Sequence, residues 1–280
     1  MASLPLLVSL MGATFHAQAN NQLPDIGTAG VAALPIEQEV RYGNAFMRFA
    51  RAGLPIIDDP VLSEYIDDLG QRLLTNADGV RFPFTFFLIN DPSINAAAFL
   101  GGRVKVHTGL FLYADNESEL ASVLAHEITH VTQRHIARYM EAQASSSAMT
   151  LAGLVGSIAL AVINPTAGIA ALQTTLGLSM QSAINYTRDN EYEADRIGMK
   201  TLYDAGFDPM GMASFFQKLA AEYRYASKPP EMLLTHPLPE TRISEARARA
   251  NSYGRRALPP SLDFWLAKVR IQVRYGTESP

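Results

Sequence analysis

The 280-residue chain contains no cysteine. Disulfide bonds and thiolate metal sites are therefore excluded, and any bound metal must be held by histidine and carboxylate side chains. The chain also lacks an excess of positive charge, because its 23 lysines and arginines are outnumbered by 27 acidic residues, for a formal net charge of −4. A nucleic-acid groove or a polybasic membrane surface needs clustered lysine and arginine, so neither kind of contact is expected.

Long hydrophobic runs are scarce as well. The region Met149 to Met180 is rich in Ala, Gly, Leu and Ile, but its first apolar run, Leu151 to Ile163, is too short. A helix that spans a bilayer needs roughly 20 apolar residues. We therefore expect a soluble helical pair that covers a site or contacts a partner, and peripheral membrane contact is the alternative.

The first nineteen residues have the pattern of an export signal. Leu4 to Leu10 is a short apolar run, and Ala17-Gln18-Ala19 matches an A-x-A cleavage site. No Lys or Arg precedes the run, so a frayed apolar terminus is the alternative. The pattern predicts a signal peptide at residues 1–19, a mature chain that starts at Asn20, and a location outside the cytoplasm.

Hydrophobic periodicity predicts an α+β fold that is mainly helical, with a small β-sheet. The expected strands are Phe84 to Ile89, Ile94 to Phe99 and Arg103 to His107, the last two joined as a hairpin by Gly101-Gly102. The expected helices are Ile36 to Ala52, Pro60 to Leu74, one that starts near Asn116, Ser182 to Ala205, Pro209 to Tyr223, Pro239 to Asn251, and Leu262 to Val273.

His126-Glu127-Ile128-Thr129-His130 is an H-E-x-x-H motif. On a helix, residues four apart lie on one face, so two imidazoles can bind one Zn²⁺ while the Glu between them takes a proton from bound water. A helix is indicated independently by an apolar stripe of Leu120, Leu124, Ile128 and Val131. The alternative is a pair of surface histidines on an ordinary helix.

A catalytic zinc needs a third protein ligand, and the acidic segment Asn190 to Asp195 offers Glu191 and Glu193. Glu191 and Asp195 are four residues apart and project from one helical face. This spacing favours Glu191 as the ligand, with Asp195 accepting the second ring N–H of a ligand histidine. Taken alone, such an acidic cluster is more often a solvated surface.

These two motifs and a third resemble the M48 family of zinc metallopeptidases, which belong to the gluzincins. The third, Leu233 to Arg242 (LLTHPLPETR), is similar to the late H-P-x-x-x-x-R element of that family. The similarity extends from about Ile36 to Asn251. It implies a zincin-like metalloprotease domain, at residues 20–254, with an active-site helix that carries the H-E-x-x-H motif.

The resemblance implies one Zn²⁺ per chain, with His126, His130 and Glu191 as ligands and Glu127 as the general base. It also implies a role for His236, either as an additional ligand that blocks the water position or as a polar group near the transition state. Without the resemblance, a histidine before proline in a loop is more often structural.

Arg242 can pair with a site carboxylate or with the substrate backbone, and a surface salt bridge is its ordinary alternative. The segment Asn95-Ala96-Ala97-Ala98-Phe99 looks like the edge strand that lines the cleft in this family. Its small side chains would let an extended substrate add as a strand. A plain hairpin strand is the alternative. His107 and His135 are expected not to be ligands, the latter because it lies about 140° around the helix from His130.

The function that the resemblance implies is a periplasmic protease that degrades misassembled outer-membrane proteins and assists their assembly. Its partners would be unfolded or misassembled protein substrates and the outer-membrane β-barrel assembly machinery. A second hypothesis is a chaperone or docking scaffold with a latent or structural zinc site, and a third is a zinc hydrolase of another bond. Residues 255–280 are expected to form a linker and the first helix of a tetratricopeptide-like module.

Overall fold

The computed structural model describes residues 34–142, 148–164, 166–168, 170–171, 180–225 and 230–276. The expected signal peptide and parts of the apolar region 149–180 lie outside these residues. The fold is α+β and mainly helical, as expected. Its elements are α1 (Ile36–Gly53), α2 (Pro60–Leu74), β1 (Thr85–Ile89), β2 (Ala96–Phe99), β3 (Arg103–His107), α3 (Thr108–Tyr113), α4 (Glu117–Thr132), α5 (His135–Ala142), α6 (Ala148–Ile163), α8 (Met180–Asp204), α9 (Met210–Tyr225), α10 (Glu231–Thr235), α11 (Glu240–Tyr253) and α12 (Leu262–Tyr275).

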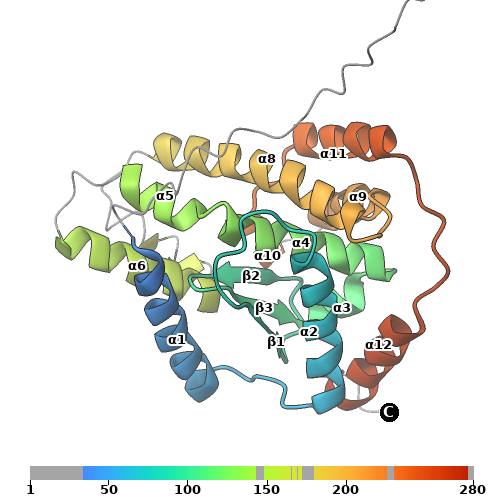
Figure 1. The fold of residues 1–280 in the computed structure, drawn as a ribbon, viewed down its shortest axis with the longest axis horizontal. Helices are drawn as coiled ribbons and strands as arrows, with labels where there is room; N and C mark the ends of the chain where they lie inside the picture. The colour runs from blue at the N-terminus through green and yellow to red at the C-terminus, as the bar shows by residue number, and fades with distance from the viewer. Residues whose placement is uncertain are drawn as a thin grey trace, which may run out of the picture.

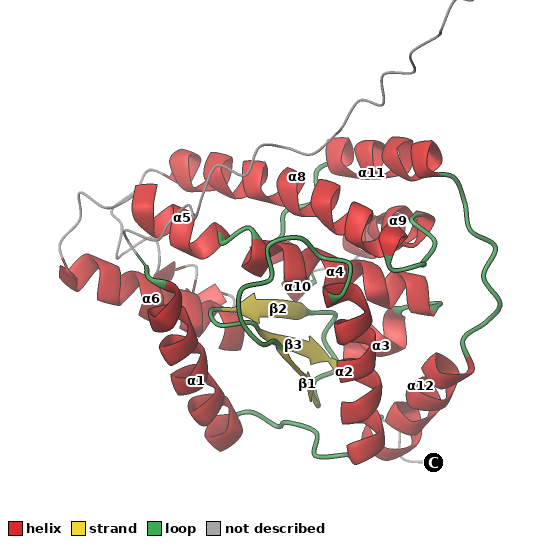
Figure 2. Cartoon of the chain, in the orientation of Figure 1, coloured by secondary structure: helices red, strands yellow, loops and turns green. Residues whose placement is uncertain are grey.

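The sheet has the strand order β1-β3-β2 and is surrounded by helices (Figure 2). β1 pairs parallel to β3, whereas β2 pairs antiparallel to β3 with Ala97 opposite Lys105. The expected hairpin is confirmed: Gly101 and Gly102 have φ of 68° and 71°, a conformation that glycine adopts without steric cost. β2 therefore forms one edge of the sheet.

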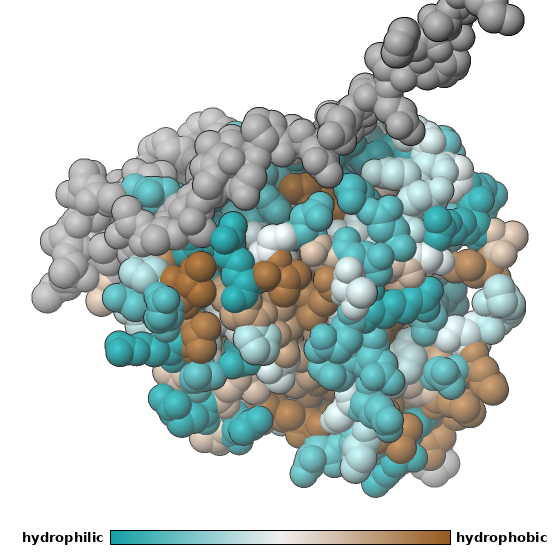
Figure 3. Space-filling model, viewed as in Figure 1, coloured by the Kyte–Doolittle hydropathy of each residue, from teal (hydrophilic) through white to brown (hydrophobic). Residues whose placement is uncertain are grey.

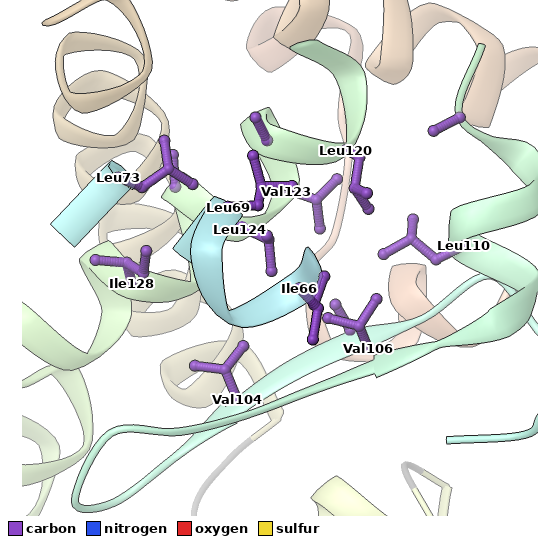
Figure 4. Close-up of a cluster of buried hydrophobic side chains, with 14 of the residues drawn as sticks. Ile66, Leu69, Leu73, Val104, Val106, Leu110, Leu120, Val123, Leu124 and Ile128 are labelled. Atoms are coloured by element: carbon purple, nitrogen blue, oxygen red, sulfur yellow. The ribbon is translucent and has the colours of Figure 1, made fainter. Parts of the chain in front are cut away.

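The main core lies where α2 and α4 meet the sheet. Figure 4 shows Ile66, Leu69 and Leu73 of α2 directed toward α4 and toward the valines of β3. α2 begins at Pro60, and the side chain of Asp59 accepts hydrogen bonds from the backbone N–H groups of Val61 and Leu62. This packing fixes α4 relative to the edge strand.

α4 passes through the middle of the molecule, between the sheet and α8 (Figure 1). Asn116 caps its first turn by accepting from Glu119 N–H, and Glu119 reaches back to accept from Asp115 N–H. Every residue from Ser118 to Thr129 is buried. A helix that is covered on all sides holds its polar side chains in fixed positions, which a metal or catalytic site requires.

α12 packs against α2 and α3. Phe264 and Ile271 are fully buried, and Arg270 and Arg274 donate to the Asp59 carboxylate. The opposite face of α12 is exposed and apolar, at the lower right of Figure 3, and includes Leu262, Trp265, Leu266, Val269 and Val273. The division of residues 255–280 into a linker and the start of another module stays a prediction.

Three short helices, α3, α5 and α10, were not expected from the sequence. Within the described residues no helix combines the length and the apolar character that crossing a membrane would require.

The helices α4 and α8 approach each other closely at Gly198, where an added Cβ would lie 3.1 Å from the backbone oxygen of Ala125. Glycine at this position brings α8 against the H-E-x-x-H segment.

Candidate metal centre

The two histidines of the motif face the same side of α4. Their Nε2 atoms are 3.0 Å apart, and their rings are inclined by 68°. His126 is almost fully buried, while the side chain of His130 retains 17% exposure. Helical spacing therefore brings two imidazole nitrogens together at the floor of the site.

α8 contributes two carboxylates one helical turn apart. Glu191 Oε2 lies 3.3 Å from His126 Nε2, and Glu191 Oε1 lies 3.3 Å from His130 Nε2. Asp195 Oδ1 lies 3.0 Å from the other ring nitrogen of His126, Nδ1. Asp195 thus leaves the metal-facing nitrogen of His126 free for a ligand role.

His236 lies at the C-terminal end of α10, which joins the site from a distant part of the chain. Its Nδ1 is 3.3 Å from His126 Nε2 and 3.1 Å from Glu191 Oε1. Its Nε2 is 3.4 Å from Glu127 Oε1. His236 therefore stands between the group of candidate ligands and the carboxylate expected to act as the base.

His126, His130, Glu191 and His236 form a group whose donor atoms all lie within 4.8 Å of one another. Five of the six separations between these atoms are 3.0 to 3.3 Å. Zinc binds nitrogen and oxygen at about 2.0–2.2 Å in a tetrahedron, for which neighbouring donors are about 3.3 Å apart. The residues therefore fit a small tetrahedral metal ion in both donor type and spacing.

Arg242 is buried, with 2% exposure, between the two carboxylates of α8. It donates two hydrogen bonds of 2.7 Å to Asp195 and lies 2.9 Å from Glu191 Oε2. Burial alone would raise the pKa of Glu191, but the nearby His236 and Arg242 hold that pKa well below its usual value. Arg242 pairs with site carboxylates, one of its two expected partners, and is not a surface residue.

Glu127 connects the metal group to the edge strand. Its Oε2 accepts a 2.8 Å hydrogen bond from Ala98 N–H, and burial raises the pKa of its carboxyl group. Asn95 O accepts from His107 N–H, so the backbone groups of Ala96 and Ala98 point away from β3. The side chain of Asn95 contacts Glu231 of α10.

His107 and His135 lie outside the four-residue group. His107 is buried near Lys105 and Ser93. His135, however, is not 140° away on a continuous helix: α4 ends at Thr132, and His135 Nδ1 lies 2.8 Å from His130 Nδ1. The expected direction of His135 was wrong, because the chain turns between the two histidines.

Sequence reasoning considered Glu193 only as the less favoured ligand candidate and assigned no role to Arg138. Glu193 Oε2 lies 3.1 Å from His135 Nε2 and accepts from Arg138 Nη1 at 2.7 Å. The hydrogen bonds from His135 and Arg138 lower the pKa of Glu193 to about 2. Because residues two apart on a helix diverge by about 200°, Glu193 cannot face the same side as Glu191. In the sequence, only the spacing between Glu191 and Glu193 could have indicated that Glu193 has a role separate from metal binding.

Comparison with known proteins agrees with this geometry. The model of peptidase family M48 matches residues 60–250, and the chain belongs to this family. The beta-barrel assembly-enhancing protease of Yersinia pestis is 53% identical over 260 residues, which are 93% of this chain and 54% of that protein. The protein of the same name from Escherichia coli is 51% identical over 261 residues, again 93% and 54%. Metalloprotease LoiP of Escherichia coli is 28% identical over 208 residues, 70% of this chain and 74% of that protein.

The chain thus spans about half the length of the beta-barrel assembly-enhancing proteases that it matches. Membership of a metallopeptidase family implies a bound metal, and the four-residue group of histidines and Glu191 is where the described residues could hold it.

Proposed function

We propose that the chain is a zinc-dependent endopeptidase, with His126, His130 and Glu191 as ligands and Glu127 as general base. The observation that carries the proposal is the position of Glu127. Its carboxylate lies on the ligand helix and is held by the backbone of the edge strand, where an extended substrate would bind. A structural metal site has no need of a carboxylate at this point.

Zinc, when bound, supplies a Lewis acid that lowers the pKa of water toward about 7 and polarises the scissile carbonyl. Glu127 Oε1 is buried and has no hydrogen-bond partner within the described part of the chain, so it can accept the water proton. Glu127 then delivers that proton to the leaving amine. The substrate backbone adds as a strand along Ala96 and Ala98, which makes binding tolerant of side-chain sequence. Because Ala96 is fully buried here and Ala98 N–H is bonded to Glu127, this binding requires the site to open first.

His236 controls access to this chemistry. Its Nδ1 lies within the ligand group and its Nε2 lies beside Glu127, so in this arrangement it takes the position that water would need. Cleavage then requires the segment after α10 to move. The arrangement is a closed resting state, and Arg242 remains in place beneath it by pairing with Asp195.

The substrates, partners and location follow from the relatives. Proteins named beta-barrel assembly-enhancing protease match 93% of this chain, which supports unfolded or misassembled outer-membrane proteins as substrates and the β-barrel assembly machinery as partner. The pattern at residues 1–19 supports export to the periplasm. Peripheral membrane contact through the apolar region 149–180 stays part of this proposal.

The test uses the purified, zinc-loaded chain and an unfolded β-barrel outer-membrane protein as substrate. Glu127→Gln should bind zinc as the parent does but cleave about 10²–10⁴-fold more slowly, because only proton transfer is lost. Equal cleavage by the parent and by Glu127→Gln would refute the proposal. Loss of cleavage with undiminished assistance of substrate assembly would instead favour the chaperone or docking scaffold.

His236→Ala tests the closed state separately. If His236 blocks the water position, the variant should cleave faster than the parent, with unchanged dependence on zinc. Slower cleavage would make His236 part of the catalytic apparatus and would contradict its role as a gate. Metal analysis of both proteins shows whether the three remaining ligands still hold one zinc per chain.

A further inference from the structure

The turn between α4 and α5 directs His135 back toward the metal group. Arg134 has φ of 53°, the left-handed conformation that costs a non-glycine residue about 1–2 kcal/mol. Its guanidinium is buried and donates two hydrogen bonds, of 2.9 and 2.7 Å, to Glu39 of α1, and a third to the backbone oxygen of Leu34. This anchoring holds the strained turn and thereby fixes the direction of His135.

His135 contacts the one ring nitrogen of His130 that does not face the other ligands. The two rings are nearly perpendicular, at 85°, with centroids 4.8 Å apart, and their Nδ1 atoms are 2.8 Å apart. Two nitrogens at this distance form a hydrogen bond only if one carries a proton and the other a lone pair. The direction of that hydrogen bond determines which nitrogen of His130 can bind a metal.

The carboxylate of Glu193 determines the direction of the hydrogen bond between His135 and His130. Its carboxylate, held by Arg138, can only accept, so His135 Nε2, 3.1 Å away, carries the proton of a neutral imidazole. His135 Nδ1 is then the lone pair that accepts from His130 Nδ1–H. His130 Nε2 is left unprotonated and points toward Glu191, 3.3 Å away.

The two motif histidines are therefore supported in parallel ways from α8. Asp195, paired with Arg242, contacts His126 Nδ1 directly. Glu193, paired with Arg138, acts on His130 through an interposed imidazole. One acidic segment thus provides a candidate ligand, Glu191, and a partner for each histidine.

We infer that His135 and Glu193 are positioning residues that set the tautomer and ring orientation of His130 for metal binding. The inference rests on the proposed function, since the tautomer of His130 matters only if that residue is a ligand. Neither residue touches the metal or the substrate. Partners of this kind typically contribute 10–100-fold to metal affinity or activity.

The test measures zinc affinity by competition with a chelator and reads the protonated nitrogen of His130 by long-range ¹H–¹⁵N NMR of histidine-labelled, zinc-loaded protein. His135→Phe keeps the ring volume but removes the acceptor. It should weaken zinc binding about 10–100-fold and leave His130 without a fixed Nδ1–H. His135→Asn places an amide oxygen near the former Nδ1 and should restore affinity to within about threefold of the parent's.

Two further variants separate this role from simple packing. Glu193→Ala should reproduce part of the loss, because the proton of His135 is then free to move to Nδ1. It also keeps the inference testable if His135→Phe does not fold. His107→Gln replaces another buried histidine, one outside the ligand group, and should leave zinc affinity unchanged.

Unchanged zinc affinity in folded His135→Phe and Glu193→Ala would overturn the inference. So would equal impairment of His135→Asn and His135→Phe, or a parent protein in which His130 Nε2 carries the proton. A parent protein that binds zinc but cleaves no substrate would refute the proposed activity. It would leave the positioning role of His135 and Glu193 unaffected.

Discussion

The buried His107 gives a quantitative prediction of how the free energy of unfolding depends on pH. Its side chain is 3% exposed, its Nε2 lies 3.0 Å from Lys105 Nζ, and its Nδ1 lies 2.8 Å from Ser93 Oγ. Burial, reinforced by the positive charge of Lys105, lowers the pKa of His107 from 6.5 to about 4, against the opposing effect of Asp91. His107 is therefore neutral in the folded protein at pH 5, whereas in the unfolded chain it is charged.

The sign of the effect follows from proton counting. Between pH 6.5 and 4 the unfolded state binds one proton that the folded state does not, so lowering the pH favours unfolding. The stabilisation is complete above the unfolded pKa of 6.5 and is lost as the pH falls toward the folded pKa. A shift from 6.5 to about 4 corresponds to about 3 kcal/mol of unfolding free energy.

His107→Gln removes the titration but keeps an oxygen that can accept from Lys105 Nζ. Urea unfolding of parent and variant at several pH values between 4 and 7 gives the two stability curves. The parent should lose about 3 kcal/mol more than the variant between pH 6.5 and 4. A gap between the curves that is the same at both ends of this range would refute the reasoning, whatever the variant's stability at neutral pH.

Three other predictions concern the stability of α4 and the effect of metal binding on the stability of the protein. Asn116→Ala removes the cap of α4 and should cost about 1 kcal/mol, seen as a lower melting temperature, while a melting temperature equal to the parent's would contradict the capping geometry. Leu124→Ala opens a cavity at a fully buried position of the same helix and should cost about 2–5 kcal/mol in urea unfolding, a range that an unchanged midpoint would exclude. Adding zinc to the metal-free protein at 100 times its dissociation constant should stabilise it by about 2.7 kcal/mol, and a melting temperature insensitive to both zinc and chelator would count against the metal centre.

Local signals in the sequence predicted much of this molecule. α2 has the bounds that apolar spacing and Pro60 indicated, and α12 begins at the expected Leu262. The start of α4 followed from Asn116 and Glu119, and the hairpin followed from Gly101-Gly102. These features depend on residues within one or two turns of one another, so the sequence carries their physical cause directly.

The parts that could not be predicted depend on distant residues. Arg134 adopts its left-handed conformation because Glu39, far away in the sequence, pairs with it in the interior. Nothing near His135 indicates that turn, so a continuous helix was the reasonable expectation, and it was wrong. The parallel pairing of β1 with β3 and the position of His236 likewise result from packing between segments that are remote in sequence.

The charges at the site explain why such remote segments are held together. The Nε2 atoms of His126 and His130 face each other at 3.0 Å, and Glu191 lies 3.3 Å from each. Nδ1 of His126 lies 3.0 Å from Asp195 and Nδ1 of His130 lies 2.8 Å from His135, so the two Nε2 lone pairs would point at each other and at a carboxylate whose charge is only partly compensated. Arg242 neutralises part of the negative charge from behind but cannot enter this group. A divalent cation at the centre turns these repulsions into bonds, so metal binding should stabilise the contacts of α8 and α10 with α4 as well as enable the chemistry.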